Sequence, residues 1–310
     1  MAKPKLNNLI RWLALIVLLG VVVYIAVLST TDDGAGLIQK ISQLSLNNLI
    51  APIGLSLMSY LFRFVRWRLI LKQLGHKLPL KSDCLYYLSG FALTMTPGKS
   101  GETIRSAFLL QAKVPVQTSL SAFVIERSFD LLVVGLLATL LFIPALVTLL
   151  LFLSALAIIC FIGAQLAKKR WLGFNVSLPK IALHMLDMVS HASIALKPKC
   201  VLAYALLGCA AWGAQGLGFY YIVHLFTQDV YMLRAISTYC AGLFVGAASL
   251  IPGGIGVTEG SLSWLLQTQG LDQNSAILSA LISRGCTLWL AVAIGCCALT
   301  AIIRGQTISK

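Results

Sequence analysis

The stretch MTPGKSGETIR (residues 95–105) interrupts a hydrophobic segment that runs from Cys84 to Leu110, and a second interruption, LIPGGIGVTEG (residues 250–260), lies inside the segment from Ala235 to Gln267. Proline and clustered glycines break a helix and free its backbone N–H and C=O groups. Such backbone survives at membrane depth only inside protein or beside a water-filled cavity. Each half of each segment has about 12–16 residues, too few to cross a bilayer. We therefore predict two re-entrant helical hairpins, each turning back near mid-membrane.

The composition of the whole chain supports a membrane setting. Of its 310 residues, 58% are hydrophobic and 11% are charged, and the mean hydropathy is +0.89. Soluble domains carry about 25% charged residues, and a soluble protein with so few would expose apolar patches and aggregate. The net charge of +14 would suggest a nucleic-acid partner for a soluble protein. Here we expect no nucleic acid, because basic residues collect in the cytoplasmic loops of membrane proteins.

Six further hydrophobic segments approach or exceed the roughly 20 residues that a transmembrane helix needs. They cover residues 13–28, 49–71, 117–144, 145–167, 201–226 and 276–303. A cytoplasmic N-terminus places the basic stretches 72–81 and 168–199 and the C-terminus on one side, as the positive-inside rule requires, provided that neither interrupted segment crosses. We therefore expect an all-α polytopic protein of the inner membrane. It would have about six full transmembrane helices, two opposed re-entrant helical hairpins and cytoplasmic termini.

The interrupted segments also mark an inverted repeat. Pro97 precedes Arg127 by 30 positions, Pro252 precedes Arg284 by 32, and each arginine falls in the span after its hairpin. The predicted orientation makes the first hairpin enter from the cytoplasm and the second from outside. Paired Gly/Pro-interrupted segments in inverted halves are typical of transporters whose substrate site lies at the repeat interface. The alternative is that each turn is an ordinary loop between two short spans, or a kink in one long span.

The chain is expected to form a single integral membrane domain, residues 1–310, with the two repeats at about residues 84–142 and 232–303. Between them, the polar stretch 168–199 contains a segment, 181–196, with the pattern of an interfacial amphipathic helix. The eight cysteines show no CxxC or Cys/His metal spacing. We read them as small packing residues, and we expect neither a metal nor a cofactor.

Eight ionisable side chains inside the interrupted segments and the spans that follow them form the candidate site, because charges at membrane depth are rare and expensive. Four basic and four acidic members balance formally: Lys99, Arg105, Arg127 and Arg284 against Glu102, Glu126, Asp130 and Glu259. The half-helix after each turn would offer free N–H groups and a positive dipole end to an anion. We therefore predict that the substrate is bound by the four basic residues together with the turn glycines Gly98, Gly101, Gly253, Gly254 and Gly256.

The four carboxylates are predicted to serve in proton coupling or in ion pairs. Glu102 and Glu259 follow the turns directly and are the candidates for carrying a proton. Arg127 shares a helix face with Asp130, but spacing alone leaves open whether it pairs with Asp130 or, across the hairpin, with Glu102. The alternative to a substrate or proton site is a static ion-pair core.

Three arginines near the end of the second span, Arg63, Arg66 and Arg68, carry less information. Long basic side chains at a helix end extend to the membrane surface and bind lipid headgroups. We expect all three to anchor or orient this helix. The alternative is that they form a basic entrance for the substrate.

Taken together, these motifs resemble the lysylphosphatidylglycerol synthase transmembrane-region family, also called the flippase-like family. The resemblance covers about residues 10–303 and rests on TPGxxGExxR (96–105), ERxxDL (126–131), PGGIGVxEG (252–260) and RxxTLW (284–289), in this order. It implies a polytopic inner-membrane protein that moves polar lipids between leaflets, among them aminoacylated phospholipids and hopanoid or polyprenyl-linked lipids. Lys99 and Ser100 stand where many relatives have Arg and a hydrophobic residue, so the headgroup stays open.

We expect a transporter or flippase for an anionic or phosphate-bearing lipid, with the headgroup held between the hairpin tips. Fused relatives carry a soluble aminoacyl transferase domain after the membrane part. This chain ends at Lys310, and we expect it to be no enzyme. One alternative is a structural or accessory subunit of a lipid or cell-envelope pathway. Another is a membrane lipid-modifying enzyme, which would need a nucleophile with its base or a metal-carboxylate cluster. The expected partners are the lipid, a second copy of the chain, or a separate lipid-synthesis enzyme.

Overall fold

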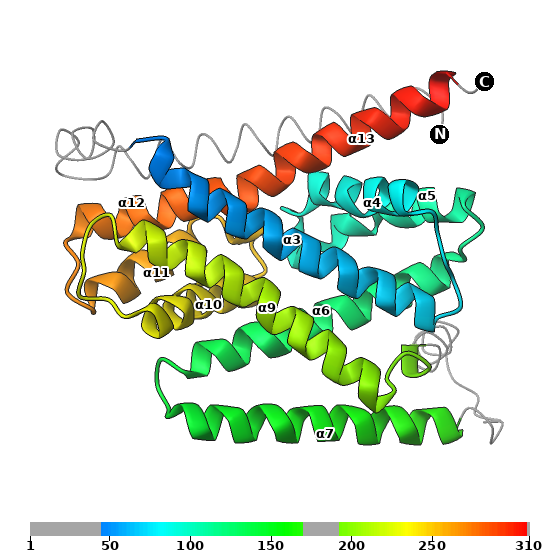
Figure 1. Ribbon diagram of the computed structural model, residues 1–310, viewed down its shortest axis with the longest axis horizontal. Helices are drawn as coiled ribbons and strands as arrows, with labels where there is room; N and C mark the ends of the chain where they lie inside the picture. Colours follow the sequence, from blue (N-terminus) through cyan, green and yellow to red (C-terminus); the bar gives the residue numbers. More distant parts are fainter. Residues whose placement is uncertain (1–44, 170–191, 309–310) are drawn as a thin grey trace.

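A computed structural model describes residues 45–169 and 192–308, and all regular structure within these ranges is helical (Figure 1). Four described helices are long and apolar enough to cross a membrane: α3 (Asn47–Gln73), α7 (Ala145–Lys169, of which the first 18 residues qualify), α9 (Pro198–Val223) and the run Gln273–Gly305. That run comprises α12 (Gln273–Arg284), a π-helical turn η4 (Gly285–Trp289) and most of α13 (Leu290–Ile308). The chain is thus a multi-pass membrane protein.

These four helices coincide with four of the six predicted spans. A fifth, α6 (Val116–Thr139), has 24 residues, and its length of about 36 Å suffices for a crossing. Three charged residues lie near its middle, Glu126, Arg127 and Asp130, and set it apart from the four helices above, so its crossing stays a prediction. The predicted span 13–28 and the interfacial helix 181–196 lie outside the described residues.

The first interrupted segment folds as a helical hairpin (residues 80–111). It consists of α4 (Leu80–Ser89) and the short η1 (Gly90–Leu93), then η2 (Pro97–Ile104) and α5 (Arg105–Gln111); α4 contacts α5, and η1 contacts η2. Gly98 and Lys99 have φ values of +59° and +55°, which turn the chain at its first elbow (residues 95–105). A Cβ atom on Gly101 would lie 2.6 Å from Leu93 Cβ, so that only glycine lets the two arms approach this closely.

The second interrupted segment is also a helical hairpin (residues 232–267). The helix α10 (Met232–Ala248) packs along α11 (Val257–Gln267), with η3 (Pro252–Gly254) at the turn between them. A Cβ atom on Gly246 would lie 1.9 Å from Thr258 Oγ1, which explains the glycine at this contact. The arms of the second hairpin are therefore as closely packed as those of the first.

The two hairpins point at each other. Figure 1 shows α4 and α5 at the right of the molecule and α10 and α11 at the left, and the elbows η2 and η3 are in contact between them. Two helical hairpins with touching tips thus approach from opposite ends of the long helices, while the inverted repeat itself stays a prediction. The re-entry of each hairpin into a bilayer stays a prediction.

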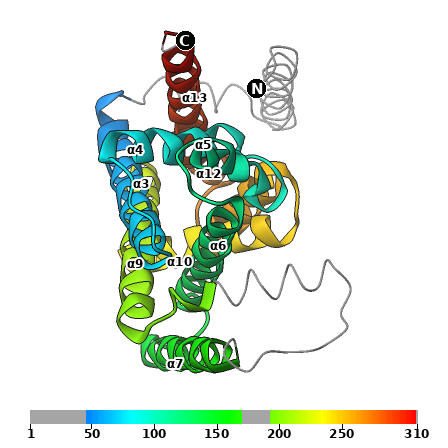
Figure 2. The same cartoon turned by 90° about the vertical axis from the view of Figure 1, so that its right-hand side faces the viewer.

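Long helices enclose the hairpins. The helix α3 packs along α9, α6 contacts α3, α9 and α10, and α13 packs against α4 and η1. A Cβ atom on Gly295 would lie 2.1 Å from the backbone nitrogen of Ala92, so α13 crosses the first hairpin at a distance that leaves no room for a side chain at this position. Figure 2 shows α7 beneath α6 and α9, on the side of the molecule away from α13. The outer helix α7 exposes much of its apolar side-chain surface, as a lipid-facing helix does.

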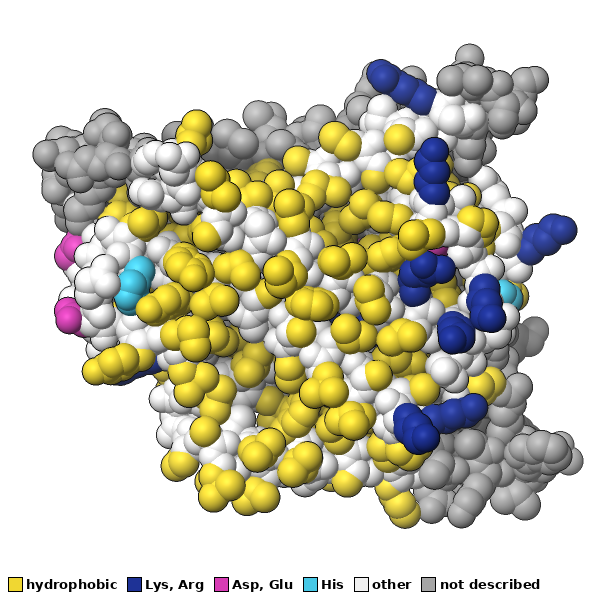
Figure 3. Space-filling view, in the orientation of Figure 1, with side chains coloured by type: hydrophobic (Ala, Val, Ile, Leu, Met, Phe, Trp, Pro, Cys, Tyr) yellow, Lys and Arg dark blue, Asp and Glu magenta, His cyan; other side chains and the backbone are white. Residues whose placement is uncertain are grey.

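The surface separates basic from acidic ends. Figure 3 shows most of the visible Lys and Arg side chains at one end of the helices, most of the visible Asp and Glu at the other, and apolar side chains over the region between. Exposed members of the basic end follow the C-terminal part of α3: Lys72, Lys77 and Lys81. The exposed acidic residues Asp229 and Asp272 precede α10 and α12. This asymmetry along the helix axes is the kind that the positive-inside rule describes.

Candidate functional site

A cavity of about 280 Å³ lies where the two elbows meet α3, α6 and α9. Both elbows contribute backbone to its wall, since Gly98, Gly253 and Gly254 are among the lining residues. Its charged lining consists of four basic side chains and a single carboxylate: Arg63, Lys99, Arg127, Arg284 and Asp130. The cavity is therefore a cationic space between the hairpin tips.

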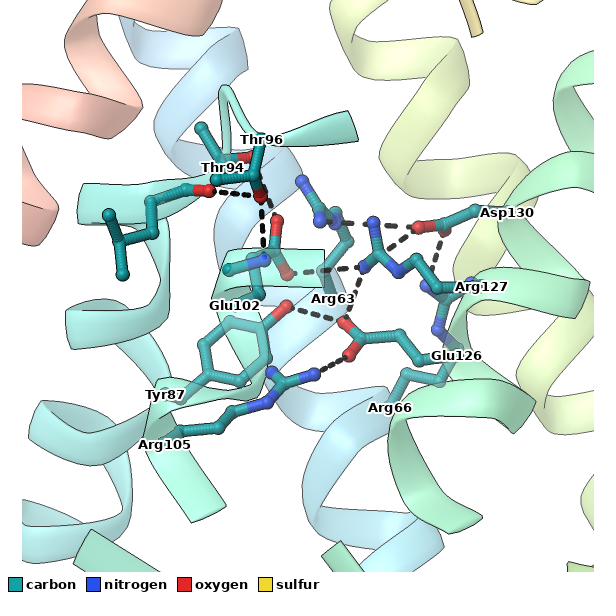
Figure 4. A network of polar contacts seen from close by, with 12 residues as sticks. Arg63, Arg66, Tyr87, Thr94, Thr96, Glu102, Arg105, Glu126, Arg127 and Asp130 are labelled. Carbon is teal, nitrogen blue, oxygen red and sulfur yellow. Dashed lines mark hydrogen bonds and ion pairs between the residues drawn. The ribbon is translucent and has the colours of Figure 1, made fainter. Parts of the chain in front are cut away.

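Arg127 is the central cation of the first half of the molecule (Figure 4). Its Nη2 lies 3.0 Å from Asp130 Oδ2, 3.2 Å from Glu126 Oε1 and 3.7 Å from Glu102 Oε2. The sequence left open whether Arg127 pairs with Asp130 or with Glu102. In the structure Asp130 is the nearer partner, and Glu102 lies at a longer distance across the hairpin. One arginine thus ties α6 to the first elbow.

Asp130 connects three helices. Its carboxylate accepts hydrogen bonds from Arg66 Nη2 at 2.5 Å and from Trp212 Nε1 at 2.9 Å, and Arg63 Nη2 lies 4.0 Å away. The expectation that Arg63 and Arg66 anchor α3 at the membrane surface is wrong, because they are only 3% and 0% exposed. Both extend from α3 toward α6 inside the protein, where Asp130 offsets the cost of burying them.

Arg68 differs from its two neighbours on α3. Its side chain is 36% exposed, its Nε lies 3.2 Å from Asp83 Oδ2, and its Nη2 donates to the carbonyl of Leu78. It lies among the exposed lysines of the basic end. Of the three arginines, it is the one whose position suits anchoring at a membrane surface.

A second buried ion pair joins α5 to α6. Arg105 Nη2 donates to Glu126 Oε2 at 2.6 Å, and the Tyr87 hydroxyl donates to Glu126 Oε1 at 2.8 Å. The Arg105 guanidinium also lies 3.9 Å from the ring centroid of Trp67. Predicted to bind substrate, Arg105 is 1% exposed and does not line the cavity, so the structure gives it a bracing position between α5 and α6.

The first elbow is held by side chains of its own hairpin. Thr94 Oγ1 donates to Glu102 Oε1 at 2.8 Å, and the backbone N–H of Gly101 donates to Thr96 Oγ1 at 2.6 Å. Glu102 is fully buried, and its Oε2 accepts no hydrogen bond from residues 45–169 or 192–308. This carboxylate oxygen lies 3.7 Å from Arg127 Nη2, which is too far for a hydrogen bond.

Around the first elbow, basic side chains outnumber carboxylates. We call the following set the charge cluster: Arg63, Arg66, Lys99, Arg105 and Arg127 with Glu102, Glu126 and Asp130. Five basic residues face three acidic ones, an excess of two formal positive charges. The predicted neutral balance of the intramembrane charges is therefore not what folding produces, because Arg63 and Arg66 join the buried set.

Lys99 and Arg63 hold this excess. Within the described residues, no carboxylate oxygen lies within 4.0 Å of Lys99 Nζ, which instead lies 5.4 Å from the Trp212 ring centroid. Arg63 reaches Asp130 only at 4.0 Å and lies over the rings of Phe91 and Trp212. Both basic residues line the cavity. Aromatic faces thus take the place of counterions, as cation–π contacts do.

The second half of the site is a closed pair. Arg284 Nε donates to Glu259 Oε1 at 3.0 Å, its Nη2 donates to the carbonyl of Gly253, and Glu259 Oε2 accepts from the backbone N–H of Gly256 at 2.7 Å. The arginine thereby holds the second elbow in its turn. Of the predicted glycines, Gly98, Gly253 and Gly254 line the cavity, whereas Gly101 and Gly256 shape the elbows without reaching it.

Several lining side chains were not among the predicted site residues. Trp212 and Gln215 come from α9 and Tyr239 from α10; the Tyr239 hydroxyl donates to Gln215 Oε1 at 3.0 Å. They belong to none of the four motifs, and a lone polar residue such as Gln215 in an apolar span was the available signal. Within the parts of the chain that the structure describes, no three His, Cys, Asp or Glu side chains gather as a metal site requires.

Comparison with known proteins agrees with the resemblance found in the motifs. The family model described as lysylphosphatidylglycerol synthase TM region matches residues 11–295. This range includes both hairpins, the charge cluster and the Arg284–Glu259 pair. A search of curated proteins returned no significant match. The chain belongs to the lysylphosphatidylglycerol synthase transmembrane-region family and is an integral membrane protein of lipid metabolism.

Proposed function

We propose that the protein moves a lipid with an anionic, phosphate-bearing headgroup between the leaflets of the inner membrane. The observation that carries this proposal is the excess of two basic side chains, Arg63 and Lys99, at a cavity between the hairpin tips. Burying an uncompensated charge is expensive, so a site of this kind is completed by an anion. The cavity size fits a headgroup.

The chemistry of the two residues suits a phosphate. Arg63 is 3% exposed, yet its Nε and Nη2 have no hydrogen-bond partner in the described part of the chain, so these donors could bind a ligand. A guanidinium binds phosphate oxygens bidentately, and a lysine ammonium adds a point charge. Arg127, also in the lining, would stabilise the same anion while it remains paired with Asp130.

The arrangement of the hairpins supports exposure of the site to each leaflet in turn. The basic end of the molecule in Figure 3 would face the cytoplasm. The first hairpin would then enter from the cytoplasm and the second from outside. Separation of one elbow from α6 or of the other from α12 would open the cavity toward opposite sides, as inverted-repeat transporters do.

Proton coupling, if it drives transport, is better suited to Glu102 than to Glu259. Both oxygens of Glu259 accept hydrogen bonds, from Arg284 and from the backbone of Gly256. Glu102 Oε2 accepts none and lies 3.7 Å from Arg127. Arrival of an anion beside Arg127 would loosen that ion pair and favour proton uptake by Glu102. Glu102→Gln would then transport without a pH dependence, whereas retention of the wild-type pH profile would argue against this role.

The proposal is tested by transport in proteoliposomes. The probes are fluorescent phosphatidylglycerol and a phosphate-free glycolipid, and the variants are Lys99→Gln and Arg63→Gln. Loss of one charge-assisted hydrogen bond costs about 1.5–3 kcal/mol, so phosphatidylglycerol transport should fall about ten-fold or more. The glycolipid should be a poor substrate for every variant.

Lys113 provides a matched control. Like Lys99, it has a positive φ (+62° against +55°), but it is exposed and does not line the cavity. Lys113→Gln should transport within about two-fold of wild type. If Lys99→Gln and Arg63→Gln both move phosphatidylglycerol at the wild-type rate, or if the glycolipid moves as fast, the anionic site is wrong. An accessory subunit or an enzyme then becomes the better explanation.

A further inference from the structure

The cavity has two regions of opposite character. Its inner part carries the basic side chains described above. The lining residues that are also exposed at the outer surface are Gly98 and five apolar residues: Leu131, Phe244, Ala247, Leu250 and Ile251. Among the described lining residues, the most exposed side chains thus carry no polar atom, whereas the polar residues Thr96, Lys99 and Arg127 are only partly exposed. We call the five apolar residues the side portal.

The side portal lies between two helices. Leu131 comes from α6, Phe244 and Ala247 from α10, and Leu250 and Ile251 from the chain leading into the second elbow. Leu131 is 53% exposed and Phe244 43%. A Cβ atom on Gly135 would lie 3.3 Å from Phe244 Cε2, so the Phe244 ring rests on α6 and closes one end of the portal. The opening therefore faces sideways from the helices and not along them.

The apolar character of the portal indicates what occupies it. A path for a water-soluble anion would require polar groups at its mouth, since an apolar constriction excludes water and ions. Acyl chains in a bilayer, by contrast, match a rim of Leu, Phe and Ile. At about 280 Å³, the cavity is at the lower end of pockets that enclose small molecules. It has room for a headgroup, whereas the chains must remain outside.

Backbone strain is concentrated at the same place. Leu250 has φ +56° and is 67% exposed, although a leucine in the left-handed region costs about 1–2 kcal/mol. Strain of this kind persists where the surrounding structure requires it, and it clusters at ligand clamps and switch regions. Here it holds an exposed leucine at the rim of the portal, directly before the second elbow.

We infer that the side portal is where the acyl chains of the substrate leave the site while its phosphate lies between Arg63 and Lys99. The substrate class is thus a membrane lipid whose phosphate is attached close to its chains, not a free anion. This inference rests on the proposed function and adds the position of the chains. It predicts that a bulky side chain in the portal blocks lipid movement without preventing anion binding.

Adjacent alanines on α10 supply the variant and its control. Both Ala247 and Ala248 are exposed, but only Ala247 lines the cavity. In proteoliposomes, Ala247→Trp should lower transport of fluorescent phosphatidylglycerol about ten-fold, whereas Ala248→Trp should stay within about two-fold of wild type. Equilibrium binding of glycerol 3-phosphate in detergent, measured by microscale thermophoresis, should change less than about two-fold in both.

A second pair covers the case in which tryptophan prevents folding. Ala247→Cys and Ala248→Cys can be purified and then labelled with a bulky maleimide, with labelled wild type as the reference for the eight native cysteines. Only the label at 247 should slow transport. Equal transport by the two labelled proteins would overturn the portal. If Lys99→Gln and Arg63→Gln nevertheless lower transport, the anionic site remains supported and only the side portal is wrong. If these two variants also transport at the wild-type rate, the proposed function fails.

Discussion

The two elbows are built from the same parts and use them differently. Each has a Pro-Gly turn, a glutamate shortly after it, and an arginine in the helix that follows. In the second elbow, Arg284, Glu259 and the backbone of Gly253 and Gly256 satisfy one another. In the first, Glu102 and Arg127 are 3.7 Å apart, and the arginine is shared with two other carboxylates. One elbow is closed upon itself, while the other belongs to a larger network.

Under the proposed function, this difference separates a bracing elbow from a binding one. The Arg284–Glu259 pair of the second elbow has a formal charge of zero, and both carboxylate oxygens of Glu259 accept hydrogen bonds. The charge cluster of the first elbow has two basic side chains more than carboxylates, and Lys99 and Arg63 face the cavity. The two similar elbows therefore differ in charge balance, and under the proposed function only the first would offer unpaired positive charge to a ligand.

The largest expected effect comes from Asp130→Asn. This carboxylate contacts Arg66, Arg127 and Trp212, and its loss raises the positive excess from two to three. Removing one partner of a buried ion pair costs about 3–5 kcal/mol. Equilibrium unfolding in bicelles should show a loss in this range. The exposed Asp229 serves as control, and Asp229→Asn should leave the stability nearly unchanged. Equal effects of the two changes would contradict the role of Asp130 as the shared partner of three buried side chains.

A slightly smaller loss is expected for Arg284→Gln, which breaks the closed pair of the second elbow. Glu259 keeps its bond from the Gly256 N–H, so the loss should be near about 3 kcal/mol, at the lower end for buried pairs. Adding Glu259→Gln should recover part of it, because the uncompensated carboxylate disappears. Absence of any recovery in the double variant, measured as a double-mutant cycle, would show that the two residues do not act as a pair.

The glycines of the first elbow give a graded comparison. A Cβ atom on Gly101 would lie 2.7 Å from the Leu93 carbonyl oxygen and 2.8 Å from Thr96 Oγ1. Gly101→Ala should therefore lower the free energy of unfolding by about 1–3 kcal/mol through overpacking. Gly98→Ala meets no atom within 4 Å and pays only for its φ of +59°, about 1 kcal/mol. If thermal unfolding showed a larger loss of stability for Gly98→Ala than for Gly101→Ala, close packing at Gly101 would not be the main constraint on this elbow.

The smallest effect on stability, and the sharpest test of the comparison, is expected for Lys99→Gln. Among the residues that the structure describes, Lys99 has no carboxylate partner within 4.0 Å, and its removal relieves repulsion from Arg63 and Arg127. The free energy of unfolding should change by less than about 1 kcal/mol, toward greater stability. The same variant should lose transport. If Lys99→Gln instead strongly lowers the free energy of unfolding, Lys99 stabilises the fold in the way that Arg284 and Arg105 do.

Much of the fold follows from local sequence. Pro97-Gly98 and Pro252-Gly253 cannot continue a helix, and the spacing of Arg127 and Asp130 places them on one helix face, so both breaks and this shared face could be predicted, whereas the partner of Arg127 could not. The bounds of α3, α7 and α9 were predicted to within a few residues from hydrophobic length. These features depend on neighbours along the chain, which the sequence displays directly.

Which charges are paired inside the protein could not be predicted in this way. Arg63 and Arg66 resemble membrane anchors on α3 by position, and Arg105 resembles a substrate ligand by motif. Folding instead pairs Arg105 with Glu126, and Arg66 with Asp130, which lies 64 positions from Arg66 along the chain but 2.5 Å from it in space. The sequence by itself determined where helices break and which residues carry charge. Only the tertiary structure decided which charges cancel, since the energy of a buried charge depends on the distance to partners that folding brings together.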